Sequence, residues 1–394
     1  MKQRMNLREI LPLAGITVAA FIFNTSEFMP VALLTDIANS FAVSEAMAGM
    51  LISVYAWMVM ILSLPLMMLA SRMKFTPLML LVVAVFALGQ FLSSIATSYV
   101  MLMLARIVVA CAHAVFWSIA SPMAIRVVSE DHRHLAMGIV VMGSSVALIA
   151  GLPIGRVIGL ALGWRMTFAC VAVVSLFIWI YLRATLPALP ATKPFTAHEL
   201  PVLLHTKPLF SVYVFTALIV IAYYTCYSYI EPFLLQTAGM DATTVTLVIS
   251  VFGIAGMIGS ALFSKYYARL RLRFLVTVVV GVVAGLFLLK FSVQPIGAVV
   301  LNCALLGLAM TALNVSLQSE VIRNSRLDDQ AVATSIYSGI FNLGIGSGSA
   351  LGGAVCTYIT VGDVGIAGGL FGVVALAYAL IVLVPRLRAP REAR

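Results

Sequence analysis

Long, almost uninterrupted apolar segments recur along the whole chain, and they constrain its fold more than any other feature. Each is about 20 residues long, the length that an α-helix needs to cross the roughly 30 Å hydrocarbon core of a bilayer. Only 10% of the 394 residues are charged, whereas soluble domains carry about a quarter. The segments are too long, and alternate too little, for an outer-membrane barrel. The sequence therefore predicts an all-α polytopic membrane protein.

The apolar segments divide into twelve expected transmembrane helices. Their ranges are 11–36, 46–70, 77–97, 100–126, 135–160, 164–186, 208–235, 243–263, 273–291, 295–321, 330–356 and 364–385. The first segment follows a basic N-terminus, as a signal peptide would. Because no small-residue cleavage site follows a short apolar core, we expect it to be a retained first span.

The positions of lysine and arginine predict the orientation of these spans. With both termini in the cytoplasm, all but four of the 24 Lys and Arg residues fall on the cytoplasmic side or at its edge. Arg165 and Lys290 fall on the outer side, and Arg106 and Arg156 lie within spans. Cytoplasmic loops are enriched in Lys and Arg, so the net charge of +10 reflects membrane topology and not binding to nucleic acid.

A proline-rich break divides the chain into two similar halves. The expected domains are a six-helix bundle over 1–186, a cytoplasmic linker over 187–207 and a second six-helix bundle over 208–394. TSEFMP in the first helix has a counterpart in YSYIEPF of the seventh, and GLPIGRVIG of the fifth has one in LGIGSGSALGG of the eleventh. Repeated six-helix halves are typical of secondary transporters, which bind substrate between the halves near the bilayer midplane.

Two of the 14 acidic residues, Glu27 and Glu231, are expected inside spans. A charged side chain at the bilayer centre costs about 2.5–3.5 kcal/mol on insertion scales, so it usually faces a partner or a cavity. Glu27 could form a structural ion pair, reach the interface, or bind a proton or substrate. We favour the last hypothesis, and we leave functional and structural roles equally open for Glu231.

Polar residues on the fourth helix are candidate partners of Glu27. Arg106, His113 and Trp117 share one face at i, i+7 and i+11, so they are unlikely to face lipid. One interpretation is interhelical packing alone. In the other, Glu27, Arg106 and His113 form the proton-coupling site, in which His113 titrates or binds a substrate hydroxyl.

The expected substrate contacts come from both halves. Tyr224, Tyr227 and Glu231 share a face of the seventh helix, where tyrosines form either a membrane-interface belt or a surface that stacks on a sugar. Neutral amides on later helices favour an uncharged polyhydroxylated solute over a bulky cation. The complete expected set is Asn24, Glu27, His113, Trp117, Tyr224, Tyr227, Glu231, Asn314 and Asn342.

Other sequence features predict packing and not chemistry. Gly151, Gly155 and Gly159 are spaced four residues apart, which lets helices approach closely. Pro153, which lies among them, is expected to bend the helix. The five cysteines lie in apolar blocks without metal-ligand spacing. The sequence has no HExxH, P-loop or GxSxG motif. We therefore expect neither an enzyme nor a metal or cofactor site.

Several motifs resemble those of one family. GLPIGRVIG followed by GWRMTF resembles the antiporter motif of the major facilitator superfamily, and Arg106 in LARIVVACAHA sits where the drug:proton antiporter branch has an arginine. TSEFMPVALL is similar to the first-helix signature of sugar, arabinose and nucleoside efflux permeases. CAHAVFWSIA, YSYIEPF and SGIFNLGIG look like segments of bacterial sugar efflux transporters of the SotB type.

The resemblance covers essentially the whole chain. It implies a monomeric sugar:proton antiporter of the bacterial inner membrane, which exports arabinose, lactose or thiogalactoside analogues by alternating access, with the proton gradient in place of a cofactor. A multidrug or nucleoside exporter of the same fold is the alternative, and a non-transporting receptor or scaffold is a third. The third draws on MMLASRMKFT between helices 2 and 3, where Ser71 and Phe75 replace the aspartate and an arginine of the superfamily.

Overall fold

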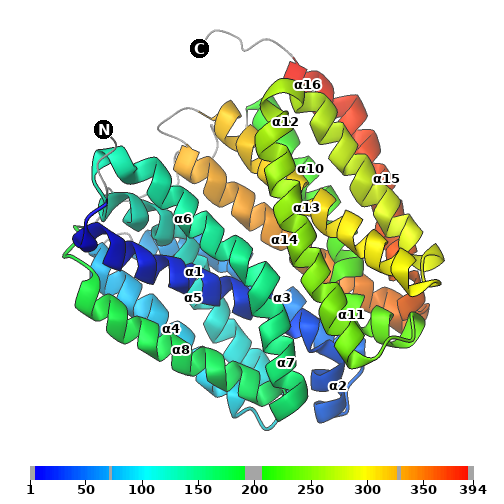
Figure 1. Ribbon diagram of the computed structural model, residues 1–394, viewed down its shortest axis with the longest axis horizontal. Helices are drawn as coiled ribbons and strands as arrows, with labels where there is room; N and C mark the ends of the chain where they lie inside the picture. Colours follow the sequence, from blue (N-terminus) through cyan, green and yellow to red (C-terminus); the bar gives the residue numbers. More distant parts are fainter. Residues whose placement is uncertain (1–4, 71–72, 191–205, 326–329, 389–394) are drawn as a thin grey trace. The chain divides into compact units, whose positions relative to one another are not determined.

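The computed structural model describes residues 5–70, 73–190, 206–325 and 330–388. The regular structure in these ranges is helical (Figure 1). The chain separates into two compact units: Met1–Val43 with Met58–Thr196, and Ser44–Trp57 with Ala197–Arg394. The first half of the second long helix thus groups with the second unit. Of the expected linker, residues 191–205 lie outside the described ranges.

The first unit is built on α1, which packs against α6 and α8, and on α4, which packs against α5 and α8. Its helices are α1 (Leu7–Ala32), α2 (Leu34–Phe41), the second half of α3 (Glu45–Ala70), α4 (Phe75–Ser94), α5 (Tyr99–Arg126), a 3-10 turn (Glu130–His132), α6 (Arg133–Val146), a π-helical turn (Ala147–Gly151), α7 (Leu152–Leu162) and α8 (Trp164–Thr185).

In the second unit, α10 packs against α14 and α15, and α12 packs against α13 and α15. Besides the first half of α3, its elements are α10 (Lys207–Tyr227), α11 (Ile230–Pro232), a π-helical turn (Phe233–Thr237), α12 (Ala242–Phe291), α13 (Ile296–Asn324), α14 (Gln330–Tyr358), a 3-10 turn (Val361–Asp363), α15 (Val364–Tyr378), a π-helical turn (Ala379–Leu383) and α16 (Val384–Arg388).

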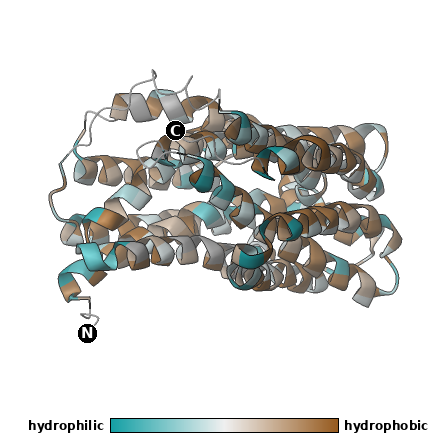
Figure 2. Ribbon diagram, turned by 90° about the horizontal axis from the view of Figure 1, so that it is seen from above, coloured by the Kyte–Doolittle hydropathy of each residue, from teal (hydrophilic) through white to brown (hydrophobic). Residues whose placement is uncertain are grey.

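The twelve expected spans are recovered among the described residues. Ten helices are long and apolar enough to cross a membrane. One of them, α12, has 50 residues and bends at Leu270, where φ is −119° and ψ is 21°, so it supplies two spans. The succession of α6, the π-helical turn and α7 supplies another. Hydrophobic residues dominate the helices along most of their length (Figure 2).

Three expected boundaries are wrong in an informative way. The first helix ends at Ala32 and not at residue 36, because the backbone breaks at Leu33 before α2 begins. The seventh breaks at Ser228 and Tyr229, four and three residues before Pro232, whose missing N–H cannot bond to Ser228. The expected loop between the eighth and ninth helices is instead continuous helix with one bend.

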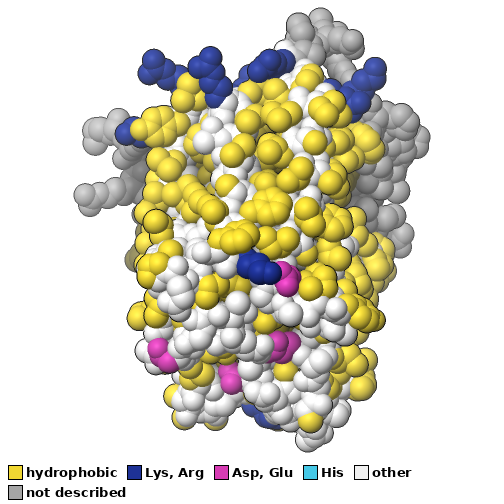
Figure 3. Space-filling view, turned by 90° about the vertical axis from the view of Figure 1, so that its right-hand side faces the viewer, with side chains coloured by type: hydrophobic (Ala, Val, Ile, Leu, Met, Phe, Trp, Pro, Cys, Tyr) yellow, Lys and Arg dark blue, Asp and Glu magenta, His cyan; other side chains and the backbone are white. Residues whose placement is uncertain are grey.

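Charged side chains are distributed as a membrane protein requires. On the face shown in Figure 3, Lys and Arg side chains gather along one rim, and hydrophobic side chains cover the wall beside it.

At the N-terminus of α12, Asp241 accepts hydrogen bonds from the backbone N–H groups of Thr243 and Thr244 and from the Thr244 hydroxyl. These bonds, chiefly those from Thr244, hold the pKa of the Asp241 carboxyl below its usual range.

Glycines bring α1 into close contact with the π-helical turn and with α7 in the first unit. A Cβ atom on Gly151 would lie 2.1 Å from Thr25 Oγ1, and one on Gly159 would lie 2.5 Å from Leu33 Cδ2. The expected close packing by this glycine stripe is therefore confirmed. Because Thr25 and Leu33 face α7, Ser26 and Glu27 are turned toward other helices.

The matching glycine-rich segment packs in the same way in the second unit. A Cβ atom on Gly344 would lie 2.6 Å from Val220 Cβ, and one on Gly348 would lie 2.6 Å from the Ile221 carbonyl oxygen. Thus α14 lies against α10 as α7 lies against α1. The weak sequence repeat between the halves corresponds to a repeated helix contact.

Candidate functional site

Pro30 creates the anchor of the candidate proton site in the first unit. In a helix, the carbonyl of Ser26 would accept a hydrogen bond from the N–H of residue 30, but proline has none. Arg106 of α5 fills that place: its Nη1 donates to Ser26 O at 3.1 Å and to Ser26 Oγ at 3.2 Å. Its Nη2 donates to the main-chain carbonyl of Glu27 at 3.3 Å. The guanidinium is 1% exposed, so these bonds form in a dry environment.

The carboxylate of Glu27 lies beside His113. Glu27 Oε2 is 3.5 Å from His113 Nε2, and the two residues are 8% and 2% exposed. The separation is long for a hydrogen bond but short for electrostatic coupling in a buried site. The structure therefore brings together all three residues expected to couple protons, with Arg106 anchored on the α1 backbone and His113 next to the carboxylate.

Aromatic rings enclose this group of residues. The ring of Phe23 stacks on Phe86 at 3.8 Å and on Phe116 at 4.1 Å between centroids. His113 lies 6.1 Å from Phe23 and 6.1 Å from Trp117 between centroids. The expected stripe on the fourth helix is thus present, with Trp117 next to His113.

Two residues of this site were not predicted from the sequence. Gln90 of α4 donates from Nε2 to Ser26 Oγ, which also accepts from Arg106. Gln90 and Ser26 are both fully buried. A single amide in an apolar helix is a weak signal, but Gln90 is one of few side chains with hydrogen-bonding groups in the third span.

Asn24, one of the predicted substrate contacts, is half-buried on α1, one turn before Phe28.

In the second unit, the tyrosines of α10 form an aromatic cluster. Tyr227 stacks on Tyr223 at 5.1 Å and lies 5.7 Å from Tyr224 and 5.5 Å from Phe252. Leu286 and Leu306 lie against the same rings and leave no room for a water molecule between them. Glu231 follows the break in α10 and is 1% exposed. The tyrosines therefore pack on one another inside the unit and do not form an exposed interfacial belt.

The predicted amides of the second unit lie on α13 and α14. Asn314 Oδ1 accepts a hydrogen bond of 2.6 Å from the hydroxyl of Tyr337. Asn342 donates from Nδ2 to the Ser338 carbonyl at 3.0 Å, and its buried Oδ1 has no hydrogen-bond partner among the described residues. An unsatisfied buried amide oxygen is uncommon and is suited to accept a bond from a ligand.

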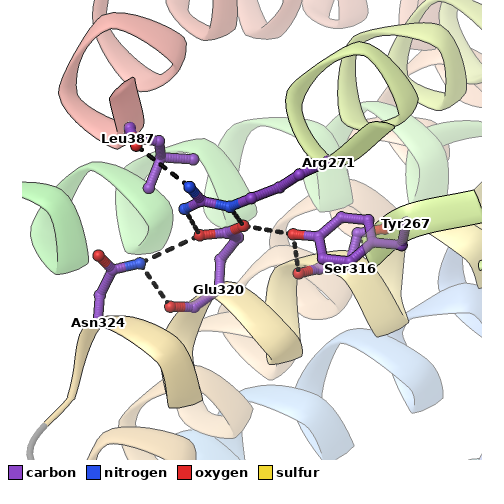
Figure 4. A network of polar contacts seen from close by, with 6 residues as sticks. All are labelled: Tyr267, Arg271, Ser316, Glu320, Asn324 and Leu387. Atoms are coloured by element: carbon purple, nitrogen blue, oxygen red, sulfur yellow. Dashed lines mark hydrogen bonds and ion pairs between the residues drawn. The ribbon is translucent and has the colours of Figure 1, made fainter. Parts of the chain in front are cut away.

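Another buried carboxylate, Glu320, lies in a polar network that could not be predicted from the sequence (Figure 4). The tenth span expected from the sequence ends at residue 321, which places Glu320 among the charges at helix ends. In the structure α13 continues to Asn324 and Glu320 is 0% exposed. Arg271 of α12 binds both carboxylate oxygens, and the Tyr267 hydroxyl donates to one of them. The helix continues past Glu320 to Asn324, and this continuation is the feature that could have indicated a buried position.

The remaining polar contacts of this network tie three helices together. Arg271 Nη1 donates to the Leu387 carbonyl of α16 at 3.3 Å, and Asn324 Nδ2 donates to Glu320 Oε2 at 3.1 Å. The segment expected as a loop between the eighth and ninth helices is therefore part of α12 and supplies an arginine that binds a carboxylate. In the first unit, Ser71 lies outside the described residues, and the Phe75 ring lies 4.7 Å from the Arg126 guanidinium.

The chemistry available to these sites is proton exchange and hydrogen bonding. Among the described residues, no group of three or more His, Cys, Asp or Glu side chains could hold a metal ion. A carboxyl beside an imidazole can gain and lose a proton, and neutral amides and phenols can bind hydroxyl groups.

Comparisons with known proteins fit this architecture. The Major Facilitator Superfamily model matches residues 16–327 and 215–394. A probable sugar efflux transporter of Mannheimia succiniciproducens is 36% identical over 390 residues, which cover 99% of this chain and 98% of that protein. Another, from Helicobacter pylori, is 39% identical over 368 residues, covering 93% of this chain and 94% of its own.

Solved structures share the fold at low sequence identity. A bacterial homologue of the human lysosomal transporter Spinster superposes with a TM-score of 0.79 at 16% identity, over 98% of this chain and 100% of that one. A peptide transporter superposes with a TM-score of 0.76 at 14% identity, over 95% and 94%. This multi-pass membrane protein belongs to the Major Facilitator Superfamily, a family of transporters and not of enzymes.

Proposed function

We propose that this protein exports sugars across the membrane in exchange for protons. The substrate class is supported by relatives at 36% and 39% identity, which are described as probable sugar efflux transporters. The observation that carries proton coupling is the buried pair of Glu27 and His113, 3.5 Å apart. A titratable carboxyl at a buried site is the usual proton carrier in transporters.

On this proposal, the residues of the first unit share the work of proton coupling. Glu27 binds the proton, and His113 responds to the change in charge because its imidazole lies next to the carboxyl. Arg106 is held by main-chain oxygens, so it provides a fixed positive charge and not a proton. Ser26 and Gln90 orient Arg106 through the shared hydroxyl oxygen.

Most of the groups proposed to bind the sugar are neutral. We propose that the predicted residues of both units contact it at some stage of the transport cycle. Rings supply stacking surfaces, and amides supply hydrogen bonds. Arabinose, lactose and thiogalactoside analogues are the first solutes to test. These residues are Asn24, Glu27, His113, Trp117, Tyr224, Tyr227, Glu231, Asn314 and Asn342.

We also propose that the protein is a monomer of the bacterial inner membrane with both termini in the cytoplasm. The distribution of Lys and Arg along the sequence supports this orientation. Reporter fusions at the C-terminus that are active only in the cytoplasm, or only in the periplasm, test it directly.

The decisive experiment is sugar flux in proteoliposomes with an imposed pH gradient. The parent protein should accumulate labelled arabinose against its gradient, whereas Glu27→Gln should lose at least about tenfold of this uphill transport, a difference of ~1.4 kcal/mol. Gradient-independent counterflow should persist in the variant. Glu130→Gln is the matched control, because Glu130 is 83% exposed and pairs with Arg133 at the surface. Uphill transport by Glu27→Gln at the parent rate would refute the proton-binding role.

A second candidate function is export of hydrophobic drugs or nucleosides. The aromatic cluster of Tyr223, Tyr227 and Phe252 supplies apolar ring surface, which favours a hydrophobic substrate more than a sugar. Competition of labelled arabinose binding by drugs and by nucleosides separates these functions. Binding of a ligand without flux under any gradient would instead support a receptor.

A further inference from the structure

Among the described residues, Tyr337 is the one whose side chain forms a hydrogen bond with the side chain of Asn314. Its hydroxyl lies 2.6 Å from Asn314 Oδ1 and 3.3 Å from the main-chain oxygen of the same residue. A main-chain carbonyl can only accept, so the phenolic hydrogen lies toward these two oxygens. The shorter of the two contacts is to the side-chain oxygen, so the structure places the amide with Oδ1 toward Tyr337, where it accepts the phenolic hydrogen.

The position of Oδ1 also determines where the Nδ2 group of Asn314 points. The two hydrogens on Nδ2 face away from the phenol, and Nδ2 has no acceptor among the described residues. Asn314 is half-buried, so this donor group is not sealed in the protein. An amide whose oxygen is occupied acts as a donor only.

Aromatic rings pack around Tyr337, which holds this amide. Phe341 lies one turn after Tyr337 on α14, with its ring centroid 6.0 Å from that of Tyr337 and 6.3 Å from that of Tyr224. Phe341 is half-buried, whereas Tyr224 and Tyr337 are 5% and 3% exposed. Amide donors beside a partly accessible ring are a suitable surface for a ring-shaped solute with acceptor oxygens.

We propose that Tyr337 is a positioning residue for substrate: it holds Asn314 as a hydrogen-bond donor to an oxygen of the sugar, next to the ring of Phe341. This inference rests on the proposed function and sharpens it, because it assigns an acceptor role to one sugar oxygen. A carbonyl or ether oxygen would satisfy the same donor, and a group that only donates would not.

The test compares arabinose binding and transport by the parent, Tyr337→Phe and Asn314→Leu. Tyr337→Phe frees the amide to turn its oxygen outward, so we expect Kd and KM to rise about 5- to 10-fold with little change in maximal rate. Asn314→Leu should cost at least as much. The double variant should bind no more weakly than Asn314→Leu alone, because Tyr337 acts through the amide.

Tyr213→Phe is the matched control. The Tyr213 hydroxyl donates to the Ala333 carbonyl at 2.9 Å, so this variant also loses one buried tyrosine hydrogen bond in the same unit. If Tyr337 were only structural, both tyrosine variants would lower the melting temperature alike and leave arabinose affinity unchanged.

A second measurement uses sugars that differ at single positions. For one hydroxyl position, the parent should bind the deoxy sugar about tenfold more weakly than arabinose, and Tyr337→Phe should reduce this preference. Parent-like affinity in Tyr337→Phe, or additive losses in the double variant, would overturn this inference while leaving sugar export intact. A parent protein that neither binds nor transports sugars would overturn the proposed function as well.

Discussion

Glu27 and Glu320 are both buried carboxylates, but their partners differ in a way that separates function from structure. Arg271 binds both oxygens of Glu320, and the Tyr267 hydroxyl donates to one of them. The carboxylate of Glu27 faces His113 at 3.5 Å, while Arg106 directs its donors to main-chain carbonyls. A carboxylate held by a paired guanidinium is stabilised in its charged form, whereas one beside an imidazole remains able to exchange a proton.

The two units also differ in how the helix accommodates a proline. In the first unit, Pro30 removes an N–H and leaves a carbonyl for Arg106. In the second unit, the helix with Pro232 breaks at Ser228 and Tyr229 instead. The same residue type in matching helices therefore leads to a braced helix in one case and a local break in the other.

Removing Arg271 should have the largest effect on stability. Arg271→Met leaves Glu320 buried without its cation, which should lower the free energy of unfolding by about 3–5 kcal/mol. Denaturation of detergent-solubilised protein, followed by circular dichroism, measures this loss. Arg269→Met is the control, because Arg269 is exposed two residues earlier. Adding Glu320→Gln should restore much of the stability. If it does not, the loss in Arg271→Met does not come from an unpaired Glu320 carboxylate.

Arg106→Lys should have an intermediate effect. An ammonium cannot reproduce the forked contacts to the Ser26 and Glu27 carbonyls, so we expect a loss of about 1–2 kcal/mol in the free energy of unfolding. Adding Pro30→Ala supplies an N–H for the Ser26 carbonyl and should reduce this loss. Arg165→Lys, at a half-exposed arginine that binds the Ala96 carbonyl, is the control. No recovery in the double variant would contradict the role given to Pro30.

Tyr267→Phe should have a smaller effect than either arginine variant. It removes one donor to Glu320 but leaves the paired contacts of Arg271, so a loss of about 1 kcal/mol in the free energy of unfolding is expected. Tyr266→Phe provides the comparison, because Tyr266 is the adjacent and exposed tyrosine. Equal melting temperatures for the two variants would show that the Tyr267 hydroxyl adds nothing to the network.

Glu27→Gln should change stability least. Its carboxylate has no paired guanidinium contact, so the free energy of unfolding should change by less than about 1 kcal/mol, even though uphill transport is lost. Thermal melting of this variant beside Glu130→Gln provides the measurement. A destabilisation as large as that of Arg271→Met would mean that Glu27 belongs with Glu320 as a structural charge.

Sequence reasoning predicted the helices and the residue types of the candidate site better than their contacts. Apolar segment length is set by the bilayer, so the spans could be predicted. Helical spacing placed Arg106 and His113 on one face, but not the distance of His113 from Glu27, which depends on packing between α1 and α5. The contact of Arg106 with Ser26 follows from Pro30, yet only the structure identifies which side chain meets the vacant carbonyl.

Residues outside the predicted site were missed for physical reasons. Glu320 lies near a helix end, where charges usually meet water, and only the packing of α12 and α16 around it makes it buried. Gln90 and Tyr337 are neutral residues in apolar helices, and their roles depend on partners far away in sequence. Periodicity cannot reveal such partners, because it describes a single helix.

The anchoring of Arg106 also has an electrical consequence. Main-chain carbonyls do not titrate, so Arg106 keeps its positive charge whether or not Glu27 holds a proton. With a neutral His113, the three side chains together carry no net charge when Glu27 is ionised and one positive charge when it is protonated. Moving one elementary charge across 100 mV is worth about 2.3 kcal/mol. On the proposed mechanism, the membrane voltage would therefore drive the proton-loaded form and leave the unloaded form unaffected.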